Sequence, residues 1–525
     1  MTLTESSRIP SFEEILKTLQ AFPVDLQRVY PRSFSSMNGL LYGMIRTGDG
    51  KKLAIIGEKE TLFKDPFHGK IFNHSPSLKV CDLSPENTLS LMELFPFTRP
   101  VSLLNYPLTI GTGDRLGLAT PGHIRAVRKF RVRPVLAQQS IRENGQTGRN
   151  FKEVIADAAW SVFQENYCEG YGADGDHLKS LDEVRLALDA GVSMITLDLS
   201  EKLKLEVISI PQEVIERRFK EEIDPGDAKV LLHLFLDKEF TFRGPRGDLS
   251  IRFLEEEVKR NVLLFHQAID FSEEVHQFLI QRTGRKHLID FEISIDEIPF
   301  PTSPALHLFI MIALHHRGVR IDSLAPRFIG EFQKGIDYRG EVTSFTEQFY
   351  HHVLIAQHYG NYKLSIHSGS DKFSIFPHVG EIAGGKIHLK TAGTSWLEAV
   401  RLISLKDPFL YREMHRQALL TFGEASKHYQ VTTDVCSIPQ IEALSDSDLP
   451  DLLYQENARQ LLHLTYGFLL KSELRDRIFK TLIHYEEDYE SLLDKHIEKH
   501  LEYLGAERID NPSVKDREKG REVLL

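Results

Sequence analysis

Residues 170–179 read Gly-Tyr-Gly-Ala-Asp-Gly-Asp-His-Leu-Lys. The segment follows a helix predicted over 151–166 and precedes an amphipathic helix predicted over 180–190. A short strand at 170–173 would therefore end where two carboxylates, an imidazole and an ammonium group come together. Folds of the α/β class place their reactive groups at this point, between a strand and the next helix. A solvated polar turn is the alternative, although a turn has no need of Asp, His and Lys together.

The same alternation of short apolar runs and amphipathic helices continues through most of the chain. Helices are predicted at 305–316 and 345–359, among others. Strands are predicted at 108–111, 132–137, 170–173, 194–198, 288–293, 322–325, 363–366 and 387–390. Alternating strands and helices imply parallel strands with right-handed crossovers, and eight such units predict an α/β fold with a TIM-type (β/α)8 barrel.

Three regions are predicted along the chain. Residues 1–104 form an N-terminal α+β extension, residues 105–400 the catalytic barrel and residues 401–525 a C-terminal helical extension. The N-terminal region should hold a helix at 11–19 and a hairpin made of 39–47 and 52–57. An insertion at about 201–250 follows the fourth strand, as a hairpin or a lid, before a long helix over 253–282. The run 431–436 could add a ninth strand, which leaves the barrel register open.

Composition limits the classes of partner. The 525 residues are 41% hydrophobic and 26% charged, which is ordinary for a soluble globular protein. A net charge of -11 argues against nucleic acid or an anionic membrane as the main partner. The first 21 residues lack the apolar core of a signal peptide, and no apolar run is long enough to span a bilayer. With three cysteines in no paired spacing, the sequence predicts a cytoplasmic protein, for which a homo-oligomer is one option.

Three predicted strand ends carry good ligands for a divalent metal. They are His177 on the third strand, Glu292 on the fifth and His367 on the seventh. Alternate strands contribute to one layer of a barrel, so the three side chains could reach one point near the axis. Two imidazoles and a carboxylate suit Zn²⁺, Mn²⁺, Fe²⁺, Co²⁺ or Ni²⁺ and do not distinguish among them. For Glu292, a structural salt bridge is an equal alternative, because a buried carboxylate needs a partner of some kind.

Cationic side chains at the same strand ends indicate the substrate. They are Lys179, Arg142, Arg327, Lys372 and Lys390. Together with a metal they fit a small polyhydroxylated anion, and a sugar acid is the simplest candidate. No phosphate-binding loop follows the seventh and eighth strands, which disfavours a phosphorylated substrate. No dinucleotide fingerprint occurs, which disfavours a hydride-transfer cofactor.

Six segments carry a resemblance to a known family. They are GTGDRLG (111–117), PGHIRA (121–126), AQQSIR (137–142), GADGDHLK (172–179), HSGSDKF (367–373) and HLKTAGT (388–394). Together they resemble the bacterial tagaturonate epimerase family over the barrel and most of the chain, with little contribution from the first hundred residues. The resemblance implies a metal-dependent interconversion of D-tagaturonate and D-fructuronate in hexuronate catabolism.

That reaction inverts a carbinol carbon one position beyond the carbon adjacent to the ketone. The hydrogen on this carbon is not acidic, so simple enolisation cannot reach it. A retro-aldol route can: a base takes the hydroxyl proton, the carbon–carbon bond breaks, the metal stabilises the enediolate, and the aldehyde fragment re-adds on its other face. Removal and return of a hydride would also invert the carbon, but would require a bound nicotinamide.

The hypothesis assigns a role to each polar side chain at the strand ends. Asp176 is the general base or acid beside His177, although Asp174 lies on the same side of the strand and the choice stays open. Asp371 or Lys179 would complement it. The substrate-binding candidates are Arg142, Arg327 and Lys390 for the carboxylate, and Gln139, Ser140 and Thr196 for hydroxyl groups. The alternatives are another barrel isomerase or aldolase of sugar acids, and a non-catalytic sugar-acid sensor.

Overall fold

The computed structural model describes residues 10–284, 288–429 and 431–509 of the chain. At its centre, eight strands close into a barrel in the order β12-β13-β14-β15-β6-β7-β8-β9, and neighbouring strands pair in parallel. The strands are β6 (Leu108–Gly111), β7 (Arg133–Ser140), β8 (Gly172–Leu178), β9 (Met194–Asp198), β12 (Asp290–Ser294), β13 (Ser323–Ala325), β14 (Lys363–Ile366) and β15 (Ile387–Lys390). The predicted (β/α)8 barrel is confirmed, and β6, β9, β14 and β15 have the predicted bounds.

The third barrel strand is longer than predicted. β8 starts at Gly172 and continues through Asp174 and Asp176 to Leu178. Its glycines and aspartates are poor strand formers, which is why the sequence placed them in a turn. In the structure they pair in register with β7, Asp174 opposite Gln138 and Asp176 opposite Ser140. The carboxylates are therefore held on a strand, which fixes their direction.

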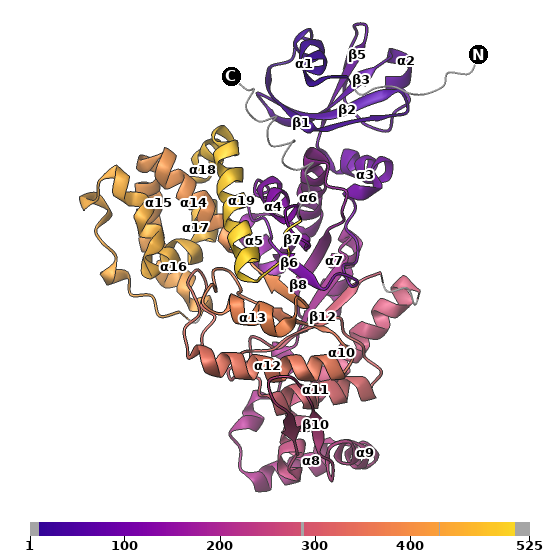
Figure 1. The fold of residues 1–525 in the computed structure, drawn as a ribbon, viewed down its shortest axis with the longest axis vertical. Coiled ribbons are helices and arrows are strands. Elements are labelled where there is room, and N and C mark those ends of the chain that lie inside the picture. Colours follow the sequence, from indigo (N-terminus) through magenta and orange to yellow (C-terminus); the bar gives the residue numbers. More distant parts are fainter. Residues whose placement is uncertain (1–9, 285–287, 430, 510–525) are drawn as a thin grey trace.

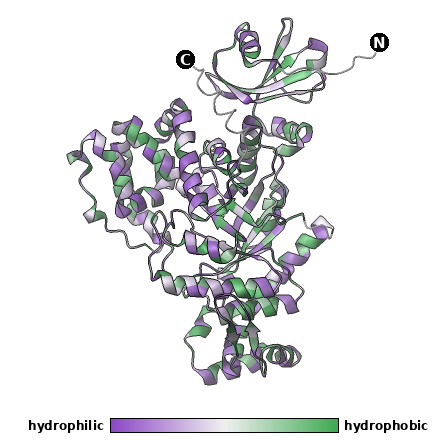
Figure 2. Ribbon diagram, in the orientation of Figure 1, coloured by the Kyte–Doolittle hydropathy of each residue, from purple (hydrophilic) through white to green (hydrophobic). Residues whose placement is uncertain are grey.

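Helices cover the barrel and bury its outer face (Figure 1). They include α4 (Thr120–Val127), α5 (Ile141–Thr147), α6 (Phe151–Glu165), α7 (Leu181–Ala190), α11 (Pro304–His316), α12 (Val342–His358) and α13 (Phe376–Ala383). Ser180 and Ser303 cap α7 and α11 by accepting hydrogen bonds from the backbone of Glu183 and Leu306. Hydrophilic and hydrophobic residues alternate along most of the outer helices (Figure 2), as expected when one face packs on a core and the other meets water. α11 differs, because residues 306–314 are all buried.

The N-terminal region combines a five-stranded antiparallel sheet with the helices α1 (Phe12–Gln20), α2 (Lys59–Leu62) and α3 (Pro85–Leu94). The strands are β1 (Leu26–Met37), β2 (Leu40–Thr47), β3 (Gly50–Gly57), β4 (Lys70–Phe72) and β5 (Ser77–Asp82). The hairpin β2–β3 stands where the sequence predicted one. Tyr42 and Phe95 pack with Phe163 of α6, so the sheet shares a core with the barrel's helical layer.

The insertion after β9 holds two helices and a short hairpin. It comprises α8 (Gln212–Glu222), α9 (Pro225–Phe235), β10 (Phe240–Phe242) and β11 (Leu249–Ile251), and it leads into the long helix α10 (Glu255–Thr283). Phe235 stacks on Phe309 of α11 with ring centroids 4.8 Å apart. The insertion thus packs on the outer helices, at the opposite end of the molecule from the N-terminal sheet (Figure 1).

A second helical body follows the barrel. It consists of α14 (Thr394–Lys406), α15 (Pro408–Ala425), α16 (Glu456–Leu464), α17 (Tyr466–Lys471), α18 (Arg475–His484) and α19 (Glu486–Tyr503). α19 returns to the barrel and packs against α4 and α14. The possible ninth strand at 431–436 is absent: these residues lie outside the strands, and a 3-10 turn begins at Val435. No helix in the described ranges is both long and apolar enough to cross a membrane.

One buried histidine of this helical body makes stability depend on pH. His415 of α15 is 1% exposed, and neither ring nitrogen has a hydrogen-bond partner among the residues that the structure describes. Burial lowers the pKa of His415 to about 4, with Glu442 opposing weakly. An unfolded chain titrates near 6.5, so it binds the proton first and the fold loses stability as pH falls from about 6.5 toward 4.

We therefore expect His415→Leu to stabilise the protein, and more so in acid. Removing an unsatisfied buried ring should raise the free energy of unfolding by about 1 kcal/mol at pH 8. At pH 5 the gain should be larger by roughly 2 kcal/mol, because the unfolded state no longer gains from protonation. Urea unfolding of both proteins at the two pH values measures this, and an equal gain at both would contradict a neutral buried His415.

Candidate active site

A cavity of about 890 Å³ opens at the carboxyl ends of the barrel strands. Its polar wall includes Arg115, Gln138, Ser140, Arg142, Glu143, Asp176, His177, Lys179, Asp198, Asp296, Glu297, Arg327, Gln333, Lys334, His367, Ser370, Lys390, Tyr429, Thr432 and His463. None of the described residues between 203 and 251 lines it, so the insertion is not a lid over this cavity in the structure. The helical extension supplies part of the wall instead.

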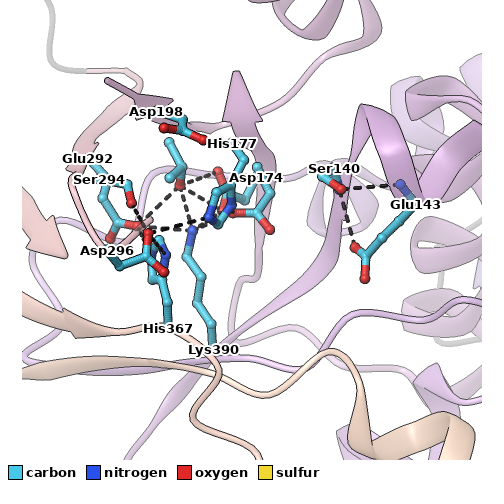
Figure 3. A network of polar contacts seen from close by, with 12 residues as sticks. Ser140, Glu143, Asp174, His177, Asp198, Glu292, Ser294, Asp296, His367 and Lys390 are labelled. Carbon is cyan, nitrogen blue, oxygen red and sulfur yellow. Dashed lines mark hydrogen bonds and ion pairs between the residues drawn. The ribbon is translucent and has the colours of Figure 1, made fainter. Parts of the chain in front are cut away.

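Lys390 holds three carboxylates together on the floor of this site. Its Nζ lies 2.9 Å from Asp174 Oδ2, 2.7 Å from Asp176 Oδ1 and 2.9 Å from Glu292 Oε1. It also donates to Thr196 Oγ1 at 2.6 Å. Figure 3 shows the ammonium group reaching from β15 toward the carboxylates. Three carboxylates and one ammonium leave an excess of negative charge in a buried place, which favours a further cation or proton nearby.

The pKa values of this group follow from that crowding. Burial lowers the pKa of Lys390, but Asp174 and Asp176 outweigh it and hold the pKa well above its usual value. Burial raises the pKa of Asp174 to about 6, against the opposing effect of Lys390. Burial also raises the pKa of Asp176, but Lys390 and His177 overcome this and hold it well below its usual range. Asp176 is thus the ionised partner, and Asp174 is the one poised to take a proton.

Two histidines face one carboxylate at the edge of the cavity. The rings of His177 and His367 lie 4.8 Å apart between centroids. His177 Nε2 is 3.6 Å and His367 Nδ1 is 3.2 Å from the same oxygen, Asp296 Oδ1. These three side chains form a group whose ligand atoms all lie within 4.8 Å of one another, close enough to hold a metal ion.

The second nitrogen of each ring is occupied by a carboxylate. His177 Nδ1 lies 2.8 Å from Asp176 Oδ1, and His367 Nε2 lies 2.8 Å from Glu292 Oε1. Metal-binding histidines are oriented in this way in many proteins. His367 Nδ1 is buried and makes no hydrogen bond within the described chain, despite its nearness to Asp296. His177 has a φ of 54°, in the left-handed region that non-glycine residues seldom adopt.

Glu292 does not belong to the group that can hold an ion. It is fully buried, and its oxygens contact His367, Lys390 and the Ser323 hydroxyl group, which donates at 2.6 Å. Asp296 is the carboxylate that lies beside His177 and His367, where Glu292 was predicted. The sequence reasoning missed Asp296 because it lies two residues beyond β12, in a loop whose path the sequence does not define.

Of the three residues predicted to bind hydroxyl groups, one lines the cavity and two do not. Ser140 lines the cavity, whereas Gln139 does not: its Oε1 accepts from Arg149 at 3.1 Å. Side chains alternate along β7, so Gln138 faces the cavity where Gln139 was predicted to. Thr196 also does not line the cavity. Its hydroxyl group donates to Asp174 and Glu292 and accepts from Lys390.

The three cations predicted for the substrate carboxylate differ in availability. Lys390 is already paired with three carboxylates. Arg327 lines the cavity and donates to the carbonyl of Ile298. Arg142 lines the cavity with its guanidinium 5.3 Å from the ring centre of Tyr429. Of these three, Arg142 is the one that lines the cavity and has no hydrogen bond or ion pair to the residues that the structure describes.

Lys179 and Asp371 were predicted to complement Asp176 in proton transfer. Lys179 lines the cavity and lies 3.4 Å from Asp198, 3.3 Å from Glu201 and 3.7 Å from Glu297. Asp371 is not on the wall. The helical extension neutralises it, with Arg459 and His496 each at 2.9 Å, because α16 and α19 pack over the loop after β14. Its position corrects that prediction: Asp371 fastens the extension to the loop that carries His367.

Comparison with known proteins identifies the family to which the chain belongs. The tagaturonate epimerase family model matches residues 30–504. A tagaturonate/fructuronate epimerase of Thermotoga maritima is 39% identical over 484 residues, which cover 91% of this chain and 96% of that protein. Crystal structures of fructuronate-tagaturonate epimerase from Cohnella laeviribosi, native and with one glycerol, are 45% and 44% identical, with TM-scores of 0.87 over 94% of this chain and 99% of theirs. The chain therefore belongs to the tagaturonate epimerase family, whose members are carbohydrate epimerases, as its motifs predicted.

Proposed function

We propose that this protein interconverts D-tagaturonate and D-fructuronate by breaking and re-forming a carbon–carbon bond, with a divalent metal as cofactor. The observation that carries the proposal is the meeting of Asp176 with the His177, Asp296 and His367 group at one edge of the cavity. A proton acceptor and a set of possible metal ligands thus face the same cavity. The names of the matching relatives supply the sugar acids.

The side chains at the edge of the cavity fit a divalent metal. His177, Asp296 and His367 would hold the ion, with the open Nδ1 of His367 directed at the site and Asp176 and Glu292 orienting the rings. Such an ion acts as a Lewis acid on substrate oxygens. Two imidazoles and a carboxylate suit Zn²⁺, Mn²⁺, Fe²⁺, Co²⁺ or Ni²⁺.

Asp176 is the residue placed to take the hydroxyl proton from the inverting carbon. It lines the cavity, whereas Asp174 does not. Both carboxylates touch Lys390, so a proton that arrives on Asp176 can be shared across the ammonium group with Asp174, the stronger base of the two. The protein thereby offers a local store for one proton between bond cleavage and bond formation. Lys179, on the same wall, can stabilise negative charge at the far side.

The cavity is also large enough for the aldehyde fragment to rotate. Its volume lies at the upper end of the range for drug-sized ligands, and a six-carbon sugar acid is smaller than these. The aldehyde fragment can therefore rotate before it re-adds, which inversion requires. A deuterium label on the inverting carbon separates this route from hydride removal. Cleavage between carbons leaves the carbon–deuterium bond intact and changes the rate little, whereas hydride removal slows it strongly.

Metal removal is the direct test of the cofactor. We expect protein stripped with a chelator to lose conversion of tagaturonate and to regain it on addition of one of the five divalent ions. NMR of the sugar identifies the product, and elemental analysis of the same sample reports bound metal. The inverted product indicates an epimerase, cleavage an aldolase, carbonyl migration an isomerase, and binding without conversion a sensor. Full turnover by protein that contains no metal would refute the cofactor.

A further inference from the structure

Four successive carbonyl groups of the loop after β13 each accept a side-chain hydrogen bond. Lys372 Nζ donates to the carbonyls of Gln333 at 3.0 Å and Ile336 at 2.5 Å. The carbonyls between them belong to Lys334 and Gly335. They accept from Gln460 Nε2 at 3.2 Å and from Arg459 Nε at 2.7 Å. The donors come from the loop after β14 and from α16, so residues 333–336 are fastened from two sides.

Lys334 belongs to this fixed loop, and its side chain has no partner among the residues that the structure describes. Lys334 lines the cavity, and its ammonium group makes no hydrogen bond or ion pair within the part of the chain that the structure describes. Glu143, the acid whose charge acts most strongly on Lys334, is already bound to Arg115 at 2.5 Å. Burial lowers the pKa of Lys334, Glu143 opposes this, and the positive charges of Arg142 and Arg115 add to it. An unpaired ammonium beside other cations is unfavourable unless an anion joins it.

Arg142 is the second cation of this wall without a carboxylate partner in the described structure. It stands at the start of α5, and its guanidinium lies against the ring of Tyr429. A guanidinium presents two parallel donors that match the two oxygens of a carboxylate, and an ammonium adds a compact point charge. The two side chains thus leave room and charge for one carboxylate between the loop and α5.

We propose that Lys334, together with Arg142, binds the carboxylate of the sugar acid and makes the site prefer uronates to the neutral ketohexoses of the same configuration. The inference rests on the proposed function for the identity of the sugar. It assigns Lys334 a role that the sequence did not suggest. The hydrogen bonds to these four carbonyls hold the loop that carries Lys334 in place before the substrate arrives, so that little conformational entropy is lost on binding.

The test compares two sugars that differ only at the last carbon. Tagaturonate carries a carboxylate there and tagatose a hydroxymethyl group. We expect Lys334→Met to weaken binding of tagaturonate about 10- to 100-fold by calorimetry. Binding of tagatose should change less than about three-fold. In turnover of tagaturonate the loss should fall on KM more than on kcat, because the carboxylate is remote from the reacting carbon.

Two further variants sharpen the comparison. Lys334→Arg keeps the charge and should restore most of the affinity for tagaturonate. Lys427→Met removes an exposed lysine, 65% exposed in its side chain, and should change nothing. Equal weakening for both sugars, or none for tagaturonate, would overturn the proposal. If the wild-type protein binds tagaturonate without converting it, the proposed function fails, while the calorimetric comparison still decides the role of Lys334.

Discussion

Replacing Asp176 with asparagine lowers turnover of tagaturonate by about two to four orders of magnitude, the loss expected when a positioned acid–base group is removed. The amide keeps an oxygen near Lys390 and His177, so the fold and the bound metal should be retained. KM should change little, because the proton transfer occurs only after binding. Steady-state kinetics, with elemental analysis of the same preparation, checks both parts of this expectation.

Asp174→Asn is the matched variant. Asp174 contacts the same ammonium group but does not line the cavity, so its loss should slow turnover by less than about ten-fold. If Asp176→Asn retained near-normal turnover, Asp176 would not be the base. If Asp174→Asn caused the larger loss, the proton would leave the substrate toward Asp174, and the two carboxylates would exchange roles.

Lys390→Met has the largest expected effect on stability. It removes the cation from three buried carboxylates, and breaking a buried ion pair from one side costs roughly 3–5 kcal/mol. Urea unfolding should show this loss at neutral pH. As pH falls, the unpaired carboxylates bind protons more readily in the folded state than in the unfolded state, so the variant should recover stability in mild acid.

A double variant keeps this expectation testable even if Lys390→Met folds poorly. Adding Asp174→Asn removes one of the uncompensated charges and should restore part of the lost stability. Lys363→Met serves as a control, since this buried lysine on β14 donates to a carbonyl and a hydroxyl group, at 3.3 and 3.5 Å. If the control and Lys390→Met lost equal stability, the carboxylates would not be the reason for the effect.

The barrel was predictable because its signal is repeated. Eight apolar runs alternate with amphipathic helices, and the parallel pairing of buried strands leaves few other folds for such a chain. The misjudged strand was β8, where Gly172 and Asp174 contradict strand preference. Asp174 is paired there with Lys390, which lies more than two hundred residues away in the sequence. A local pattern cannot report such a partner.

The site was predictable only as far as strands define direction. His177, His367 and Lys390 lie at the ends of strands, and all three line the cavity as the sequence predicted, with Lys390 paired to carboxylates. Asp296 and Lys334 lie in loops, whose paths depend on contacts with other elements. Tyr429 and His463 reach the cavity from the helical extension, where the sequence shows only amphipathic periodicity. Nothing in that periodicity tells which helix turns back to the barrel.

The fastening of the loops by the C-terminal helices bears on how the protein is made. The last barrel strand, β15, is complete once Lys390 has been added to the growing chain. The donors that hold residues 334 and 335 arrive only with α16, and the histidine that neutralises Asp371 arrives with α19. Synthesis runs from the N-terminus, so the nascent chain contains every strand well before it can assemble a working site. We therefore expect the loops around the cavity to take their described positions only after α16 and α19 have been synthesised and have packed against the barrel.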